Sequence, residues 1–452
     1  MSVHLQEGLY RICRERIARD DAYRAVFGNL ADSGNDALKF SDYRDYRLRE
    51  TLKHVYQNSV FYRKLFDEHS IVLSEINTID DLGKLPFTDP GDLASGGYDF
   101  LCVSQGDVEK QVTFLSSGTT GIKKKVFFSA ADVRTILRFL SAGMNSVTHD
   151  TATVHIILPN SHGRGIGELL SNSLKIAGFD PYVTDMTWSS ERQIDLVKEK
   201  HPNVIFGNTR SIYRMTKEMT RSVDLSQLGV DVIFLTMEHA SAAMVRNLEK
   251  AWKCRVCMHY GLAEMGWGLA VECAHAPGYH YNEMDVIAEV VDPKTGKVLE
   301  NGQEGELVFT SIGREAMPLI RYRSHDIATL MNGPCACGRT LQRIGYVRKR
   351  MESTITTPGG KEITPALLDE VLYAFDDVID YSAHIDYKTG RGALSLSVEL
   401  LDRHEDIQKR ISQTVADFCV YHLGMDLPAI EYLEKGALSA MCGEKKLIRA
   451  ID

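Results

Sequence analysis

A run of glycine and hydroxyl residues between two apolar stretches has the composition of an anion-binding loop. It lies in TFLSSGTTGIKKKVFF (113–128) and comprises Ser116, Ser117, Gly118, Thr119, Thr120 and Gly121. Glycines let the backbone turn tightly so that several N–H groups face one concavity, and the hydroxyls and following lysines add donors and positive charge. These features suit a polyphosphate, although the spacing does not fit the Gly-x4-Gly-Lys-Ser/Thr loop. A polar hairpin joining two strands is the alternative interpretation.

Two segments that bear cysteine and histidine have the spacing of a metal site. Cys335 and Cys337 are separated by one residue in a turn, and ECAHAPGYH contains Cys273, His275 and His280. Four ligands from two loops are typical of a structural tetrahedral zinc site, so we expect the three cysteines and one of the two histidines to bind zinc. Free, buried cysteines and polar loop histidines are the alternative.

Several motifs in order along the chain resemble those of one enzyme family. SSGTTG followed by lysines looks like the phosphate loop of the adenylate-forming superfamily, which contains acyl-CoA synthetases, nonribosomal adenylation domains and luciferases. Further segments are similar to those of phenylacetate–CoA ligases and follow in the same order: HVYQNSVFYRKLF (54–66), DDLGKLPFTDPGDL (80–93), YGLAE (260–264), the stretch from DPKTGKVLENG to RYRSHD (292–326), CACGRTLQRI (335–344) and GEKKLIRAID (443–452). Because the similarity covers nearly the whole chain, the ordered set is more specific than any one motif.

The resemblance implies ATP-dependent activation of a small carboxylic acid, aryl or acyl, to an acyl-adenylate, followed by transfer to coenzyme A. Because a carboxylate attacks an α-phosphate, catalysis needs cations, amide dipoles and a metal directed at the developing charge. By the same resemblance, Ser116 to Gly121 wrap the β- and γ-phosphates, Glu264 holds Mg²⁺ and Tyr260 lies by the adenine.

Other matched residues are expected at the adenine, the ribose and the α-phosphate. Glu238 and His239, in FLTMEHA, match the segment that meets adenine, where the family more often shows a Gly-Ala-Glu-Pro-like sequence. Asp326 in YRSHD matches the acid that accepts both ribose hydroxyls, which suits a carboxylate with two acceptor oxygens. Arg350 in RKRMES matches the arginine near the ribose and phosphates. Lys446 matches the lysine that bridges the acyl carboxylate and the α-phosphate, with the preceding lysine as the alternative.

The resemblance also implies a movable C-terminal domain. Residues 1–349 would bind ATP and the acyl group, and residues 350–452 would form a lid. Glu352 stands at the hinge position, where the family usually has aspartate. A site that holds ATP tightly must present a new surface before a thiol can enter, so the second half-reaction requires the lid to swing.

The acid itself is not specified by the sequence. ILPNSHGRGIGELL (157–170) matches the floor of the acyl site, and its polar and basic residues indicate a polar ring substituent or a second anionic group, unless they face solvent. Two other functions stay open. One is an adenylyltransferase that stops at AMP transfer, as in deazaflavin cofactor adenylylation, or an enzyme that passes the acyl group to a carrier protein or amine. The other is a degenerate, zinc-stabilised binding protein.

Strands and helices must alternate to position these motifs. Short apolar runs at 154–159, 203–207 and 230–236 predict buried strands, and stretches at 190–201 and 209–222 predict helices between them. Such alternation implies crossover units in a mostly parallel sheet. We therefore predict an α/β protein whose large N-terminal domain has mostly parallel sheets flanked by helices and a β-rich subdomain, followed by a small mobile α+β C-terminal domain.

The two ends of the chain have their own patterns. Amphipathic helices are predicted over 5–17 and from 41 to 66. Near the other end, Thr364 as N-cap and Pro365 at the first helical position predict a helix over 364–375. Strands at 380–386 and 393–401, a helix at 402–423 and a strand near 429–433 complete the module.

Composition limits the classes of function. The chain has 452 residues, 44% apolar and 25% charged, which is typical of a globular protein. A net charge of −9 does not suit a nucleic-acid binder. There is no run of about 18 apolar residues and no apolar signal core at the N-terminus, so we expect a cytoplasmic protein without a membrane partner. Nine cysteines are too few for a disulfide scaffold. The oligomeric state stays open, although a homodimer is common among compact enzymes.

Overall fold

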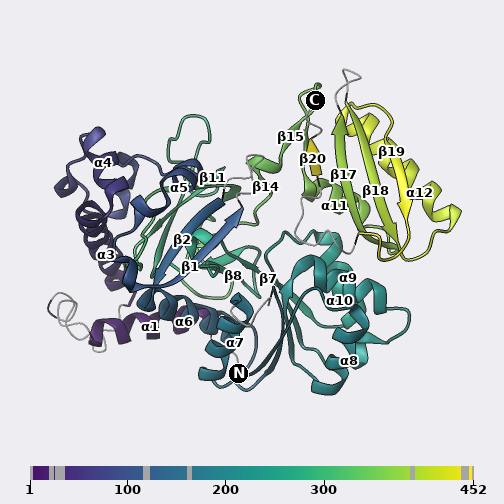
Figure 1. The fold of residues 1–452 in the computed structure, drawn as a ribbon, viewed down its shortest axis with the longest axis horizontal. Helices are drawn as coiled ribbons and strands as arrows, with labels where there is room; N and C mark the ends of the chain where they lie inside the picture. The colour runs from purple at the N-terminus through teal and green to yellow at the C-terminus, as the bar shows by residue number, and fades with distance from the viewer. Residues whose placement is uncertain are drawn as a thin grey trace. The chain divides into compact units, whose positions relative to one another are not determined.

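The computed structural model describes residues 4–19, 25, 36–115, 123–159, 165–386, 392–438 and 447–449. The chain forms two compact units (Figure 1). The first unit comprises Met1–His149 and His259–Arg348, and the second comprises Asp150–Met258 and Lys349–Asp452. Both contain helices and strands, which confirms the α/β fold class. The division into a domain of residues 1–349 and a movable lid of residues 350–452 stays a prediction.

The helices of the first unit lie mainly in its N-terminal part. They are α1 (Leu5–Arg19), α3 (Asp36–Asn58), α4 (Val60–Glu68), α5 (Pro90–Gly96) and α6 (Ala130–Val147). The single helix expected over 41–66 is wrong, because the chain forms α3 and α4 there. The hydroxyl of Ser59 accepts a hydrogen bond from the Tyr62 N–H and donates to the Asp99 carbonyl. Ser59 therefore caps α4 and starts a second helix after α3 has ended.

The strands of the first unit pair antiparallel. They are β1 (Val108–Leu115), β2 (Lys123–Ser129), β8 (Ala270–Glu272), β9 (Tyr279–Tyr281), β10 (Val286–Val291), β11 (Glu304–Ser311), β12 (Tyr322–Thr329) and β13 (Arg343–Ile344). β1 pairs with β2, and β10, β11 and β12 pair in that order. β8 pairs with His259 and Tyr260 at the end of β7 (Arg255–Tyr260), β9 pairs with β8, and β13 pairs with β9. This arrangement confirms the predicted β-rich part.

A parallel sheet lies at the centre of the second unit. Its strands follow the order β7, β6, β5, β3 and β4, with bounds β3 (Thr153–Ile157), β4 (Asp180–Thr184), β5 (Val204–Asn208) and β6 (Val232–Thr236). The connecting helices are α7 (Ile166–Ile176), α8 (Ser190–Lys200), α9 (Thr209–Met219) and α10 (Ala242–Trp252). Every residue of β5 and β6 is buried, as expected for a parallel sheet with helices on its faces. The predicted crossover units are confirmed here.

Residues 349–452 add a small α+β module to the second unit. Its elements are β14 (Lys349–Arg350), β15 (Ile355–Thr356), β16 (Glu362–Ile363), α11 (Pro365–Leu372), β17 (Val378–Asp386), β18 (Ala393–Leu400), α12 (Glu405–Asp417), β19 (Ala429–Leu433) and β20 (Leu447–Arg449). The sheet order is β19, β18, β17 and β20. Thr364 caps α11 by accepting from the Leu367 N–H, and Pro365 follows it, as predicted.

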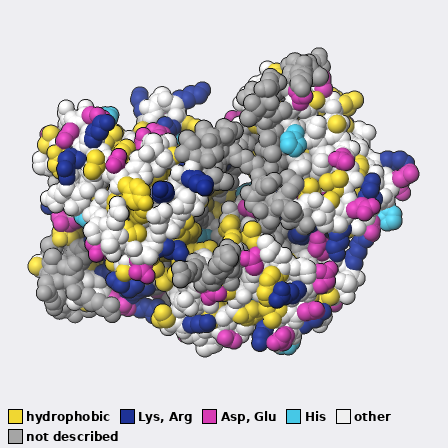
Figure 2. Space-filling view, in the orientation of Figure 1, with side chains coloured by type: hydrophobic (Ala, Val, Ile, Leu, Met, Phe, Trp, Pro, Cys, Tyr) yellow, Lys and Arg dark blue, Asp and Glu magenta, His cyan; other side chains and the backbone are white. Residues whose placement is uncertain are grey.

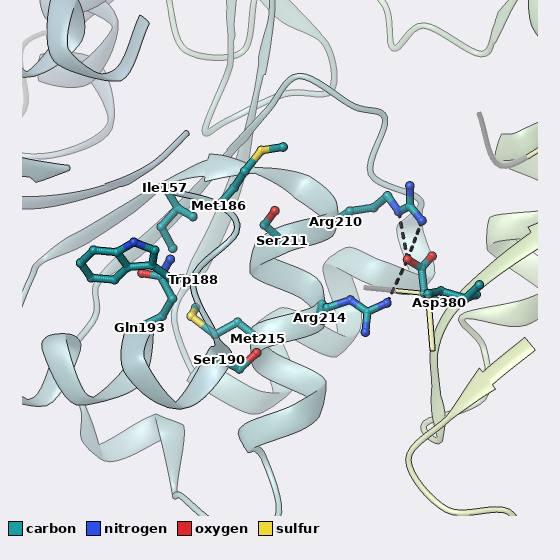
Figure 3. Close-up of a pocket in the computed structure, with 11 residues that line it drawn as sticks. Ile157, Met186, Trp188, Ser190, Gln193, Arg210, Ser211, Arg214, Met215 and Asp380 are labelled. Carbon is teal, nitrogen blue, oxygen red and sulfur yellow. Dashed lines mark hydrogen bonds and ion pairs between the residues drawn. The ribbon is translucent and has the colours of Figure 1, made fainter. Parts of the chain in front are cut away.

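Ion pairs with buried carboxylates join α9 to the C-terminal sheet within the second unit. Arg210 Nη2 lies 2.6 Å from Asp380 Oδ2, and Arg214 Nη1 lies 2.7 Å from Glu399 Oε1. Figure 3 shows both arginines directed toward Asp380, which Arg214 Nη2 also contacts at 3.3 Å. Tyr213 of α9 belongs to the same apolar core as the C-terminal strands. Because buried charges need partners, α9 and this sheet assemble together.

Charged side chains of both signs are interspersed on the surface in view (Figure 2). Exposed pairs such as Lys198–Asp195 and Lys64–Glu68 lie within single helices, about one turn apart. They contribute little to stability because water screens them. Among the residues that the structure describes, no helix combines the length and the apolar character that crossing a membrane requires.

We expect D380N to destabilise the protein by about 3–5 kcal/mol, because it removes a buried carboxylate that pairs with the buried guanidinium of Arg210 and the partly buried one of Arg214. The control is D195N, at an exposed pair with Lys198, where the change should stay below about 1 kcal/mol. Urea unfolding followed by tryptophan fluorescence measures the free energy of unfolding, because Trp188 and Trp252 both lie in the second unit. Equal midpoints for the two variants would contradict the structural role of Asp380.

Candidate active site and metal centre

The carboxylate of Glu264 is held inside the first unit by an ammonium and a phenol. Glu264 lies on a 3₁₀ turn directly after β7, and its Oε1 accepts from Lys124 Nζ at 3.0 Å and from Tyr322 Oη at 2.7 Å. Lys124 Nζ also donates to Tyr322 Oη at 3.1 Å. All three residues are buried. The carboxylate and the ammonium therefore compensate each other's charge where little water reaches them.

The backbone at Glu264 is fixed by a tight turn. Gly266 follows it with φ +84°, and a Cβ at that position would lie 2.7 Å from the Ile136 side chain. The Glu264 carbonyl accepts from Arg314, whose guanidinium lies 4.9 Å from the centre of the Phe128 ring. Burial lowers the pKa of Arg314 to about 10, so the group stays cationic at neutral pH. The direction of Glu264 is thus set by its backbone as well as by its side-chain partners.

A second tyrosine–carboxylate pair lies on the same two chain segments. Tyr260 Oη donates to Asp326 Oδ2 at 2.7 Å, and both residues are buried. Tyr260 ends β7 four residues before Glu264, and Asp326 lies on β12 four residues after Tyr322. Each segment provides one tyrosine and one acid, and each tyrosine donates to the acid of the other segment. We call these contacts the reciprocal tyrosine–carboxylate pairs.

Sequence reasoning singled out both acids and Tyr260, but it missed the roles of Tyr322 and Lys124. Tyr322 precedes Asp326 by the same four residues that separate Tyr260 from Glu264. This repeated tyrosine–acid spacing was the available signal. Lys124 is one of three successive lysines, and it alone among them is buried, whereas Lys123 is exposed. The alternation of β2 distinguishes it only once the strand is placed.

Four of the predicted metal ligands converge in the first unit. The Sγ atoms of Cys273, Cys335 and Cys337 and a ring nitrogen of His280 all lie within 4.8 Å of one another. The Sγ atoms of Cys273 and Cys335 are 3.5 Å apart, and Cys337 Sγ is 3.4 Å from His280 Nε2. Zinc bonds of about 2.3 Å to sulfur and 2.0 Å to nitrogen in a tetrahedron imply ligand pairs about 3.5–3.8 Å apart. The cluster therefore fits a structural zinc ion.

His280, rather than His275, lies among the three cysteines. Its Nδ1 lies 3.1 Å from the Leu341 carbonyl, and as the N–H donor there it leaves Nε2 to face the sulfur atoms. Burial lowers the pKa of His280 to about 4, so the imidazole is neutral at physiological pH, as a ligand must be. The His275 side chain is exposed, and its backbone N–H donates to Cys273 Sγ at 3.4 Å.

Glu238 and His239 lie where the chain leaves the carboxyl end of β6 in the second unit. Glu238 Oε1 accepts from Asn208 Nδ2 at 3.0 Å, and Asn208 caps α9 by accepting from the Ser211 N–H. Met237 has φ +73°, an uncommon conformation for a side-chain-bearing residue, and is 58% exposed. Open α/β sheets bind ligands at the carboxyl ends of their strands. Asn208 is a residue that sequence reasoning missed, although its position before α9 is a capping signal.

The remaining predicted residues are placed only in part. Arg350 is half-buried in β14, and Glu352 lies in the 3₁₀ turn Met351–Ser353 that follows. The predicted phosphate loop, the polar part of the acyl segment and the terminal lysine lie outside the described residues: Ser116, Ser117, Gly118, Thr119, Thr120, Gly121, 160–164 and Lys446. Their expected contacts stay predictions.

The sequence and the fold are similar to those of known AMP-binding enzymes and CoA ligases. Residues 111–314 match the family model of AMP-binding enzymes. The chain is 30% identical over 343 residues to a phenylacetate-coenzyme A ligase of Thermus thermophilus, covering 74% of this chain and 75% of that protein. It is 28% identical over 389 residues to a phenylacetate-coenzyme A ligase of Pseudomonas putida, covering 84% and 86%. A crystal structure of 2-hydroxyisobutyryl-CoA ligase in the postadenylation state has the same fold, with a TM-score of 0.80 at 16% identity over 92% of this chain and 90% of that one.

We expect K124M to lower the free energy of unfolding by about 3–5 kcal/mol, because Glu264 then stays buried without its cation. The double variant K124M/E264Q should recover at least about 1 kcal/mol of that loss, since the two charges are in contact. K123M, at an exposed side chain, is the control and should change little. Urea unfolding of the natural protein, K124M, E264Q and K124M/E264Q measures the coupling. Strictly additive losses would contradict the ion pair.

Proposed function

The chain belongs to the phenylacetate–CoA ligase family of AMP-forming enzymes, and we propose that its reciprocal tyrosine–carboxylate pairs form the ATP-binding centre. The enzyme is an acid–CoA ligase that uses ATP to activate a small carboxylic acid. In the first half-reaction an oxygen of the acid attacks the α-phosphorus, and pyrophosphate leaves. In the second, the thiol of coenzyme A attacks the acyl carbon, a thioester forms and AMP leaves.

Asp326 is proposed to accept the ribose hydroxyls. An ionised carboxylate offers two acceptor oxygens and no donor, which matches a vicinal diol. Tyr260 holds Oδ2 of this buried carboxylate at 2.7 Å, and this contact is the observation that carries the proposal. An acceptor that is already oriented does not have to be ordered when the nucleotide binds, so the α-phosphate is positioned at lower entropic cost. The ring of Tyr260 is proposed to lie by the adenine.

Glu264 is proposed to hold the magnesium ion that accompanies ATP. A carboxylate is the hard oxygen ligand that Mg²⁺ prefers, and the ion usually takes one or two carboxylates together with substrate phosphates. When bound, Mg²⁺ neutralises phosphate charge as pyrophosphate leaves. Lys124 already places one positive charge at Glu264 Oε1. Because Lys124 follows the predicted phosphate loop by only three residues, its ammonium is proposed to contribute to phosphate binding as well.

Other roles rest on the matched motifs. Ser116 to Gly121 are proposed to wrap the β- and γ-phosphates, and Lys446 to bridge the acyl carboxylate and the α-phosphate. Arg350 is proposed to lie near the ribose and phosphates. Glu238 and His239 are proposed to meet the adenine, supported by their place at the carboxyl end of a parallel strand.

The metal cluster is proposed to bind a structural zinc ion and to take no part in the chemistry. All four positions are protein ligands, three thiolates and one imidazole, so no coordination site stays open for substrate. The alternative functions are less well supported. Both relatives named above are coenzyme A ligases, which favours coenzyme A over a carrier protein, an amine or a reaction that ends at AMP transfer. A cytoplasmic location and a homodimer stay predictions.

A screen of small aryl, acyl and amino acids for pyrophosphate release tests the function. We expect acid-dependent pyrophosphate release, and AMP release that also requires coenzyme A. D326N should lower kcat/KM for ATP by the order of a hundredfold, which is typical of losing one charge-stabilising contact. D195N, at an exposed carboxylate of the second unit, should match the natural protein. Silence across the whole panel would favour the binding-protein alternative.

Glu352→Pro tests the proposed hinge. The substitution fixes φ and removes an N–H donor, so it should restrict rotation about this residue. We expect pyrophosphate release in the first half-reaction to be spared and thioester formation to be suppressed. Measuring each half-reaction separately, with the acyl-adenylate supplied for the second, distinguishes the two steps. Equal loss of both would refute the assignment of Glu352 as the hinge.

A further inference from the structure

We propose that the metal cluster sets the affinity for the nucleotide, by fixing the two strands whose Tyr260 and Asp326 side chains form the proposed ribose contact. The inference rests on the proposed function, both for the cluster and for the tyrosine–carboxylate pair. It concerns a part of the first unit in which short strands and the segment after β12 connect the two sites.

The first connection runs from the cluster to Tyr260 through adjacent strands. Cys273 directly follows β8 and His280 lies on β9, so both arms of this hairpin carry a ligand. In the ladder, Val271 of β8 is opposite His280, and its neighbour Ala270 is opposite Tyr260. Adjacent strands lie about 4.8 Å apart. A displacement of β9 therefore reaches Tyr260 across the single intervening strand β8.

The second connection runs from the cluster to Asp326 along the chain. Cys335 and Cys337 lie in the segment that follows β12, the strand that carries Asp326. The Gly345 N–H donates to the Thr329 carbonyl at 2.8 Å, so the chain returns beside the end of β12. β13 lies within this return and pairs with β9. The segment that holds two ligands is therefore attached to β12 at one end and to β9 at the other.

Hydrogen bonds alone hold this region weakly. β8 and β9 have three residues each, and β13 has two. Ladders of this length make few hydrogen bonds, and each contributes modestly to stability, whereas a structural zinc site contributes much of the folding free energy of a small domain. Packing is also close, because a Cβ at Gly278 in the hairpin turn would lie 2.6 Å from the Ile344 carbonyl oxygen. A metal bound at the cluster would add a strong constraint on how these short strands sit against one another.

A side chain of α1 supports the metal cluster through hydrogen bonds. Gln6 Oε1 accepts from the backbone N–H groups of Thr340 and Leu341, at 2.8 and 3.2 Å. The Leu341 carbonyl in turn accepts from His280 Nδ1. The segment that carries Cys335 and Cys337 is thus held in place by α1, away from the proposed nucleotide centre. A bound metal would link β9 and the turn after β12 to this fixed segment.

The expected consequence is thermodynamic coupling between metal and nucleotide. Without the metal, β9 and the turn after β12 gain freedom, and the Tyr260–Asp326 contact loses its fixed geometry. A nucleotide must then order these strands itself, so its affinity falls. We expect a change of roughly tenfold, within the range typical of coupled sites. Linkage is reciprocal, so the nucleotide must strengthen zinc binding by the same factor.

Calorimetric titration of AMP tests the first half of this linkage. The full chain loaded with zinc, the same protein stripped by a chelator, and C337S are compared. We expect the Kd for AMP to be about tenfold higher for the stripped protein and for C337S. C254S, which removes a thiol outside the cluster, should match the loaded protein. Equal Kd values for loaded and stripped protein overturn the inference. Absence of AMP binding in every form refutes the nucleotide centre itself, and the inference falls with it.

Zinc partition tests the second half, and its main comparison uses the natural protein alone. The natural protein and a chromogenic chelator compete for zinc at equilibrium, with and without saturating AMP. We expect AMP to raise the zinc affinity of the protein by the factor found in the titration. In D326N, where AMP lacks its proposed acceptor, AMP should have no such effect. A partition that AMP leaves unchanged overturns the inference, and so does a protein that takes up no zinc.

Discussion

A carboxylate buried away from water is stable only when a cation or a strong donor lies beside it, and this requirement determines the centre of the first unit. Glu264 meets it with Lys124 and Tyr322, and Asp326 meets it with Tyr260. Because each tyrosine reaches across to the other segment, the end of β7 and the strand β12 cannot move independently. In the proposed nucleotide centre, acyl-adenylate formation would bring two anions together, and a site that is already dry and oriented would strengthen each cation and dipole directed at them.

The need to compensate buried carboxylates also joins α9 to the C-terminal sheet in the second unit, but there it holds elements together and forms no ligand site. Asp380 and Glu399 are compensated by arginines of α9, and Glu399 also accepts from the backbone N–H groups of Gly436 and Leu438. Other protein groups compensate these charges, so the ion pairs hold α9 and the C-terminal sheet together rather than bind a ligand. It also fixes the last described residues before the segment that leads to the predicted catalytic lysine. Any swing of a lid must therefore carry α9 with it or exchange these buried pairs.

Patterns local to the chain were predicted well, and so was the grouping of Cys273 with Cys335 and Cys337, but most side-chain contacts between distant segments were not. The buried strands β5 and β6 follow from their apolar runs, and the start of α11 follows from Thr364 and Pro365. The helix break at Ser59 was missed because part of what fixes it is distant: the Ser59 hydroxyl accepts from the nearby Tyr62 N–H but also donates to the Asp99 carbonyl, 40 residues away. His275 and His280 are equivalent in sequence, and only the pairing of β9 decides between them. The partner of Lys124 is 140 residues away, a separation at which no periodicity carries information.

The chemistry also constrains where thiols can lie. An acyl-adenylate reacts with any accessible thiolate, so a free one nearby would compete with coenzyme A. Burial raises the pKa of Cys102 and of Cys254 to about 12, which keeps both as unreactive thiols at neutral pH. A metal bound at the cluster would engage the sulfur atoms of Cys273, Cys335 and Cys337. The cluster lies on β9 and the turn after β12, one strand removed from Tyr260 rather than beside it. Zinc at this position would stiffen the proposed nucleotide centre and, at the same time, occupy three sulfur atoms that could otherwise react with its product.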